Sequence, residues 1–168
     1  MLKIKDIDSY KSDKILSLQN ARKLIIKLKS KNRKVGLCHG GFDLLHPGHV
    51  KHFESAKKLC DILFVSVTSD EFVSERKGSG RPIFTDKLRA YMIASIIFVD
   101  YVVISNFKTG IEIIKILGPD YYIKGPDYKE NNDKDLTSEK KAIASIGGKI
   151  KYTKDQKLST TDLISHIR

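Results

Sequence analysis

The sequence contains no tryptophan, only two cysteines and only four prolines. Cys38 and Cys60 are too few for a disulfide framework or for a zinc site made of four cysteines. No stretch approaches the roughly 20 apolar residues that cross a bilayer, so we expect no membrane span. The first residues also lack the apolar run of a signal peptide. These features predict a protein of the reducing cytoplasm without a metal site of its own.

Acidic residues are also scarce, at 20 against 31 Lys and Arg, which gives a net charge of +11. Much of the excess lies in residues 1–34, which hold 11 of the basic residues and three of the acids. We interpret residues 1–33 as a basic, amphipathic helical lead-in and residues 34–168 as the main domain. The basic end is compatible with a solvated helix, with attraction of anionic small substrates, or with a nucleic-acid surface. A chain of 168 residues fits one domain with its own core.

Short β-rich runs alternate with segments of helical length or spacing. The expected strands are 35–38, 62–67, 101–104, 121–123 and 149–152, and the expected helices are 15–31, 48–60, 84–98, 108–117, 136–147 and 160–168. Such alternation is typical of α/β proteins in which a parallel sheet is covered on both faces. We therefore predict a single doubly wound, Rossmann-like domain with a five-stranded parallel sheet. Ligands of such folds bind beyond the carboxyl ends of the strands.

The segment that follows the first expected strand is the most informative part of the chain. Residues 38–49 read CHGGFDLLHPGH. The two adjacent glycines allow a tight turn with exposed N–H groups, and Pro47 suits the first turn of a helix. His46 and His49 would then bracket a helix N-terminus, which already favours anions through its free N–H groups and its dipole. This arrangement predicts a polyphosphate site, whereas His52 is expected at the surface.

This loop resembles a family signature. The string GFDLLHPGH over residues 41–49 is similar to the G-x-F-D-x-x-H-x-G-H loop of the cytidylyltransferase-like nucleotidyltransferases. The shorter H-x-G-H also occurs in class I tRNA synthetases, so the whole string is the more specific signal. The resemblance covers about residues 15–168.

Further matches point to the heptose-phosphate adenylyltransferase branch of this family. KGSGRP over 77–82 resembles its glycine-rich loop, Arg89 stands where the family places an arginine, and LGPD over 117–120 followed by KGPDY over 124–128 resembles its L-x-P-D and K-G-G-D-Y strings. The S-T-T string of its last helix corresponds to residues 159–161. Two positions depart from the pattern. Lys154 stands where the glycerol-phosphate cytidylyltransferases have an arginine, and Pro126 replaces a glycine.

The resemblance implies a nucleotidyl transfer, in which an oxygen of a sugar phosphate attacks the α-phosphorus of a nucleoside triphosphate and pyrophosphate leaves. Catalysis of this kind needs alignment and charge neutralisation more than a covalent intermediate. Mg²⁺ is expected to arrive with the triphosphate, because no acidic cluster forms a dedicated site. The implied catalytic residues are His46, His49, Lys77 and Lys124. The implied binding residues are Gly41, Phe42, Asp43, Arg89, Asp127, Ser159, Thr160 and Thr161, with Asp43 expected to order its loop.

Three alternatives remain at this point. The enzyme could be a cytidylyltransferase for a polyol phosphate or another sugar phosphate, because neither the base nor the acceptor is legible from side chains. It could be a nucleotide-binding regulator that has lost catalysis, although the intact histidine pair disfavours this. It could also be a nucleic-acid-binding protein, a class disfavoured by the lack of a second domain or of RNA-binding aromatic motifs. A homodimer is compatible with the family.

Overall fold

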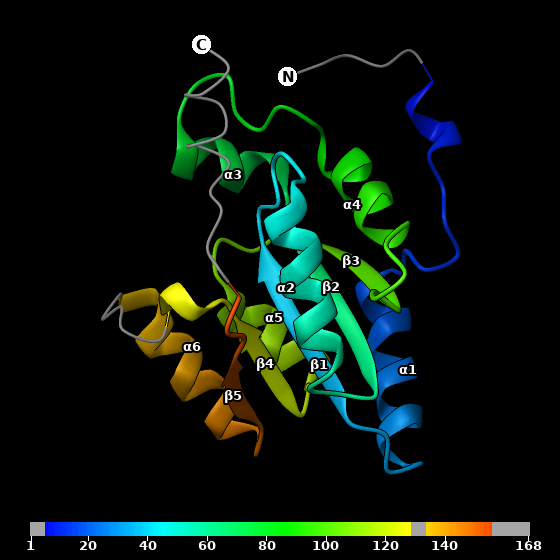
Figure 1. Ribbon diagram of the computed structural model, residues 1–168, viewed down its shortest axis with the longest axis vertical. Helices are drawn as coiled ribbons and strands as arrows, with labels where there is room; N and C mark the ends of the chain where they lie inside the picture. Colours follow the sequence, from blue (N-terminus) through cyan, green and yellow to red (C-terminus); the bar gives the residue numbers. More distant parts are fainter. Residues whose placement is uncertain (1–5, 129–133, 156–168) are drawn as a thin grey trace.

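A computed structural model describes residues 6–128 and 134–155. In this part of the chain five strands form one sheet in the order β3-β2-β1-β4-β5, and every pairing between neighbours is parallel (Figure 1). The strands are β1 Val35–Gly40, β2 Ile62–Thr68, β3 Tyr101–Ser105, β4 Tyr121–Lys124 and β5 Lys149–Tyr152. The α-helices are α1 Leu18–Lys29, α2 Pro47–Lys57, α3 Asp70–Lys77, α4 Asp86–Ala94, α5 Gly110–Leu117 and α6 Lys134–Ser145, and two 3₁₀ turns cover Ile7–Ser9 and Pro126–Tyr128. The predicted fold class is confirmed.

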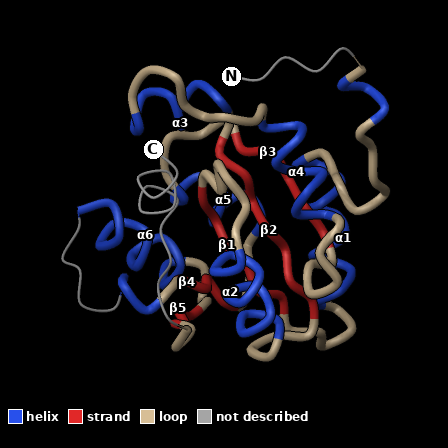
Figure 2. Tube along the Cα trace, turned by 45° about the horizontal axis from the view of Figure 1, so that its top comes forward, coloured by secondary structure: helices blue, strands red, loops and turns tan. Residues whose placement is uncertain are grey.

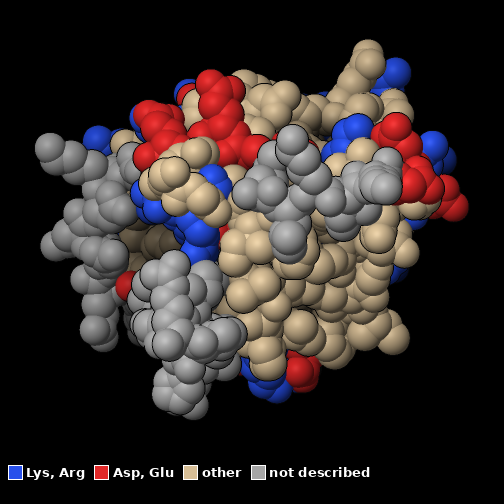
Figure 3. Space-filling model, turned by 90° about the horizontal axis from the view of Figure 1, so that it is seen from above, with Lys and Arg blue, Asp and Glu red and all other residues tan. Residues whose placement is uncertain are grey.

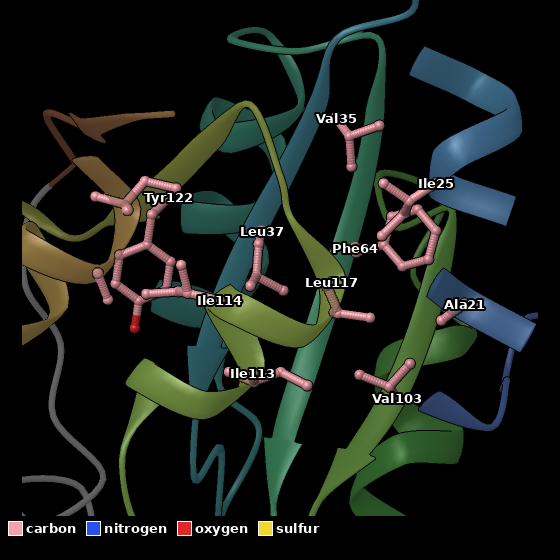
Figure 4. Packing of buried hydrophobic residues seen from close by; sticks show 12 residues of the cluster. Ala21, Ile25, Val35, Leu37, Phe64, Val103, Ile113, Ile114, Leu117 and Tyr122 are labelled. Atoms are coloured by element: carbon pink, nitrogen blue, oxygen red, sulfur yellow. The ribbon is translucent and has the colours of Figure 1, made fainter. Parts of the chain in front are cut away.

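The two faces of the sheet have separate cores, because successive side chains of a strand point to opposite faces. Leu37 and Phe64 face α1, α5 and α6, and Figure 4 shows them packed with Ile25 of α1 and Ile113 of α5. The next residue of β1, Cys38, faces the other core, where it joins apolar side chains of α2 and α4. A strand that is buried on both faces needs a continuous apolar run, which explains the composition of β2.

Helix α1 belongs to the same core as the sheet. Its Ala21 and Ile25 are fully buried, and its Arg22 donates to the carbonyl of Leu117 at the end of α5. The serine before the helix, Ser17, accepts a hydrogen bond from the N–H of Asn20 and so caps the first turn. The basic lead-in therefore uses its apolar stripe to cover β3 and α5, and the lysines lie on the outer face.

The sequence did not predict α3, which lies between β2 and α4. The helix has eight residues, of which only Val73 is buried and five are charged. Such a segment has almost no apolar stripe, which is the signal that a helix prediction needs. The expected helix over 160–168 lies outside the described residues.

The order of the strands determines where a ligand can enter. The chain runs outward from β1 through β2 to β3 and then returns to pair β4 with the opposite edge of β1. The loops after β1 and β4 therefore diverge and leave a crevice at their carboxyl ends. This is the upper end of the molecule in Figure 1, and the tube in Figure 2 shows how the loops after β1 and β2 rise over the strands.

Candidate functional site

A cavity of about 420 Å³ opens at this crevice. Its volume lies in the range of small-molecule sites. Figure 3 looks onto the face that contains it and shows lysine and arginine side chains beside a hollow. The lining comes from the ends of β1 and β4, the glycine loop, the first turns of α2, the end of α3, the start of α5 and one turn of α6.

The two histidines of the loop meet at the start of α2. His46 is the N-cap residue and Pro47 is the first residue of the helix. The rings of His46 and His49 stack with their centroids 3.8 Å apart, and the edge of Phe42 packs against His49. Both ring nitrogens of His46 and Nδ1 of His49 are buried and have no hydrogen-bond partner in the described structure. Such orphaned donors inside a cavity indicate a site that a polar ligand completes.

The histidine pair is uncharged at neutral pH in the free protein. Burial, and after it the neighbouring ring of His46, lowers the pKa of His49 from 6.5 to about 3. The pKa of His46 is lowered as well, first by burial and then by Lys77. Each neutral imidazole thus offers one hydrogen-bond donor and one acceptor, and a bound polyanion would favour its protonation.

The stability of the fold should therefore depend on pH through His49. The unfolded chain binds a proton at this histidine below about pH 6.5, and the folded chain does so only near pH 3. Because the unfolded state then holds more protons, the free energy of unfolding should fall as the pH drops from 7 to 5. We expect His49→Gln to reduce this dependence in urea titrations at pH 7, 6 and 5. A residual dependence should remain, because burial also lowers the pKa of His39 to about 3. An unchanged slope in the variant would assign the pH dependence to other groups.

Two residues that the sequence associates with binding, Asp43 and Arg89, hold the glycine loop from the side away from the cavity. Asp43 is fully buried, pairs with Arg81 and accepts a hydrogen bond from the N–H of Ile83 at 2.6 Å. Arg89 of α4 is also fully buried, and its guanidinium donates to the carbonyl of Gly41. Neither Asp43 nor Arg89 lines the cavity. The structure therefore gives both a positioning role, which for Asp43 is the role expected from the sequence.

The other sequence-predicted residues lie on two sides of the cavity. Lys77 ends α3 beside Arg76, and Gly78 follows it with a φ of 87°. Lys124 ends β4 across the cavity, with Asp127 in the 3₁₀ turn after it. Gly41 and Phe42 line the wall between these two groups. The sequence had indicated that Lys77 belongs to a glycine loop. The structure instead makes it the last residue of α3, because this helix extends to Lys77.

The remaining predicted positions lie either outside the described residues or away from the cavity. Ser159, Thr160 and Thr161 lie outside the described residues. Lys154 is exposed and does not line the cavity. In residues 6–128 and 134–155, no group of three His, Cys, Asp or Glu side chains could hold a metal ion, and no helix is long and apolar enough to cross a membrane.

The prediction that His52 lies at the surface is wrong. This side chain lines the cavity one turn beyond His49, and its ring joins Thr153 Oγ1 at 3.1 Å to Cys38 Sγ at 3.4 Å. Ser55 donates to Asp155 one turn further along the same helix, at 2.7 Å. These contacts fasten α2 to the chain that leaves β5. The spacing of residues 46, 49 and 52 was the available signal, because residues three apart share a helix face.

Sequence reasoning also missed Glu139. This side chain reaches the cavity from α6, where its carboxylate lies 2.8 Å from Lys124 Nζ and accepts a hydrogen bond of 3.0 Å from the N–H of Gly110. Its position in a lysine-rich helix gives no sequence signal for either contact.

The comparison with known families agrees with this geometry. The model of the family described as cytidylyltransferase-like matches residues 37–166. The chain belongs to the cytidylyltransferase-like family. The predicted family and, at that level, the enzyme class of the nucleotidyltransferases are thereby confirmed.

Curated relatives are longer proteins. The bifunctional protein HldE of Campylobacter jejuni strain RM1221 is 40% identical over 126 residues, which cover 74% of this chain and 27% of the relative. HldE of Aliarcobacter butzleri is 36% identical over 162 residues, which cover 95% of this chain and 32% of the relative. The chain thus spans about a third or less of the length of these relatives.

Solved structures share the fold. The lipopolysaccharide core biosynthesis protein of Thermoplasma volcanium superposes with a TM-score of 0.59 at 25% identity and covers 76% of this chain and 99% of that one. The pantoate-beta-alanine ligase of Francisella tularensis superposes with a TM-score of 0.62 at 17% identity and covers 91% and 76%. At this identity the second likeness concerns the fold alone.

Proposed function

We propose that this chain transfers a nucleoside monophosphate, with AMP favoured, from a nucleoside triphosphate to a sugar phosphate of the heptose 1-phosphate type and releases pyrophosphate. The observation that carries the proposal is the stacked pair His46 and His49. Both residues line the cavity at the positive end of α2, and three of their ring nitrogens are buried without a hydrogen-bond partner among the described residues. A polyphosphate supplies the hydrogen-bond partners that this site lacks.

The mechanism follows from where charge develops. As the acceptor oxygen attacks, negative charge grows on the oxygens around the α-phosphorus and on the leaving pyrophosphate. We assign donation to this group to His49, in the first turn of α2, and to the N–H groups of Gly41 and Phe42 in the glycine loop. Lys77, the last residue of α3, lies near enough to His46 for its charge to help lower the pKa of that histidine. Fixed donors of this kind accelerate the step because they need no reorganisation when the charge appears.

The partners of the reaction follow from the same chemistry. Mg²⁺ is proposed to enter bound to the triphosphate, where it neutralises phosphate oxygens, since the described residues hold no metal cluster. A location in the cytoplasm, where nucleoside triphosphates are available, and a homodimer are part of the same proposal. The proposal does not extend to the parts of the longer relatives that this chain does not match.

The decisive experiment is a matrix of four nucleoside triphosphates against several sugar and polyol phosphates, with pyrophosphate release as the readout. We expect turnover with ATP or CTP, a modest preference for ATP, and poor use of GTP and UTP. The strings at 77–82 and 124–128, which resemble the heptose-phosphate branch, motivate this order.

A preference for CTP above about tenfold in kcat/KM, which corresponds to about 1.4 kcal/mol, would overturn the adenylyl assignment. It would support the cytidylyltransferase alternative, particularly if a polyol phosphate were the better acceptor. The absence of pyrophosphate release with every pair would reject the catalytic proposal itself.

A further inference from the structure

The two sides of the cavity differ in charge. On the α3 side, Arg76 and Lys77 line the wall, and within the described residues neither belongs to an ion pair. On the opposite side Lys124 is neutralised by Glu139. Lys108, in the loop after β3, is neutralised by Glu75 of α3. Phosphate groups are therefore attracted to the histidine and α3 side. The Lys124 side carries no excess of positive charge, because Lys124 is paired with Glu139 and the cavity lining also includes Asp127 and Asp155.

The Lys124–Glu139 pair is almost closed to solvent. The side chain of Lys124 is 9% exposed and that of Glu139 is 6% exposed. Lys124 Nζ lies 4.5 Å from the centre of the Tyr128 ring, which adds a cation–π contact to the ion pair. A buried charge pair holds its geometry because separation would leave both charges unsolvated. The pair thus forms a rigid part of the cavity wall.

Glu139 also occupies donors that would otherwise attract an anion. One carboxylate oxygen accepts from the N–H of Gly110, the first residue of α5, and the other faces the ammonium of Lys124. A lysine ammonium beside a helix N-terminus is a favourable place for a phosphate. Here an internal carboxylate fills that place, so a phosphate could bind only by displacing Glu139.

Packing keeps the carboxylate where it is. A Cβ atom added at Gly110 would overlap both Glu139 and the hydroxyl of Tyr122. Tyr122 is fully buried, and burial together with the Glu139 carboxylate raises its pKa well above the usual range. The phenol therefore stays neutral beside the carboxylate and adds no negative charge to this wall.

We propose that Lys124 and Glu139 form a specificity-determining pair that binds hydroxyl groups of the acceptor and keeps its phosphate on the opposite side of the cavity. An ammonium has three donors and a carboxylate has about four acceptor positions, so both keep capacity after pairing with each other. A hydroxyl both donates and accepts, which matches this neutral pair better than a phosphate does. The proposal rests on the proposed function and names the polyhydroxylated part of the acceptor as the ligand of this wall.

The first test measures the affinity for inorganic phosphate by calorimetry. Glu139→Gln keeps an oxygen that can accept from Gly110 but leaves the ammonium of Lys124 without its counter-charge. We expect this variant to bind phosphate at least tenfold more tightly than the wild type. Glu112→Gln is the matched control. Glu112 is an exposed residue in the first turn of α5, the helix whose first N–H group, that of Gly110, donates to Glu139. Equal phosphate affinity in Glu139→Gln and the wild type would overturn the proposal.

The second test uses a neutral double variant, which keeps the proposal testable if Glu139→Gln does not fold. Lys124→Gln with Glu139→Gln removes both charges and retains one amide at each position. We compare kcat/KM for a sugar phosphate and for ethyl phosphate, which lacks hydroxyl groups. The wild type should prefer the sugar phosphate, and the double variant should lose at least tenfold of that preference, expressed as the ratio of the two kcat/KM values.

An equal loss with both acceptors would mean that the pair is only structural and would reject the proposal. Failure of the proposed function is a different result, since the wild type would then release no pyrophosphate with any acceptor. In that case the phosphate affinities of Glu139→Gln and Glu112→Gln still decide whether Glu139 excludes an anion from this wall.

Discussion

Replacing His49 with alanine should lower kcat for pyrophosphate release by about 10² to 10³, the usual cost of one preorganised donor to developing charge. The side chain lies in the first turn of α2, and its Nδ1 is buried without a partner among the described residues. This nitrogen makes no hydrogen bond within the described part of the fold, so it is available to a ligand. Stopped-flow or coupled detection of pyrophosphate under saturating substrates measures the loss directly.

The fold should tolerate this change. His49 loses a stacking contact with His46 and an edge contact with Phe42, and an aromatic pair contributes roughly 0.5–1.5 kcal/mol. Lys51→Gln is the control, because Lys51 lies on the exposed side of the same helix and pairs with Glu54. It should keep wild-type turnover. Near wild-type pyrophosphate release by His49→Ala would remove this histidine from the mechanism.

The sequence was informative wherever burial forced a pattern. Within the described residues, all five strands and five of the six α-helices were predicted, because strands with two buried faces need continuous apolar runs and amphipathic helices need an apolar stripe. The missed helix, α3, has neither feature. It exists because the chain must return from β2 to α4, and its buried residue Val73 packs close to Gly41 in the glycine loop.

The candidate site was predictable only on the side that a single loop supplies. Residues 38–49 contain the two adjacent glycines and the histidine pair in one contiguous string, so their chemistry can be predicted from the sequence alone. Glu139 meets Lys124 only because α6 packs beside α5, and nothing in the spacing of 15 residues indicates that contact. A wall built from separate elements needs the tertiary structure to be recognised.

Arg89 leads to the second prediction of large effect. Its guanidinium is fully buried in α4 and makes three contacts, with the carbonyl of Phe84 at 3.0 Å, the carboxylate of Asp70 at 2.6 Å and the carbonyl of Gly41. Removing one partner of a buried pair leaves the others desolvated without compensation. Arg89→Met should therefore lower the free energy of unfolding by about 3–5 kcal/mol.

Urea titration against two comparison variants separates the charge from the geometry. Lys87→Met removes a cation from the same helix, but Lys87 pairs with Asp8 at the surface, where an ion pair contributes about 0–1 kcal/mol. Arg89→Lys keeps the charge but cannot reach three acceptors in the fork geometry of a guanidinium, so it should fall between the wild type and Arg89→Met. A loss below about 1 kcal/mol in Arg89→Met would show that the site relaxes around the missing group.

The same substitution should also affect turnover, because Arg89 joins two elements of the cavity wall. It holds the carbonyl of Gly41 in the glycine loop and Asp70 in the first turn of α3, the helix that ends at Lys77. Arg89→Lys, measured well below its melting temperature, should therefore lose kcat while it remains folded. Asp70→Asn tests the route: if Arg89 acts on α3 through Asp70, the effects of Arg89→Lys and Asp70→Asn on kcat should be less than additive in the double variant. Additive effects would confine the influence of Arg89 to the glycine loop.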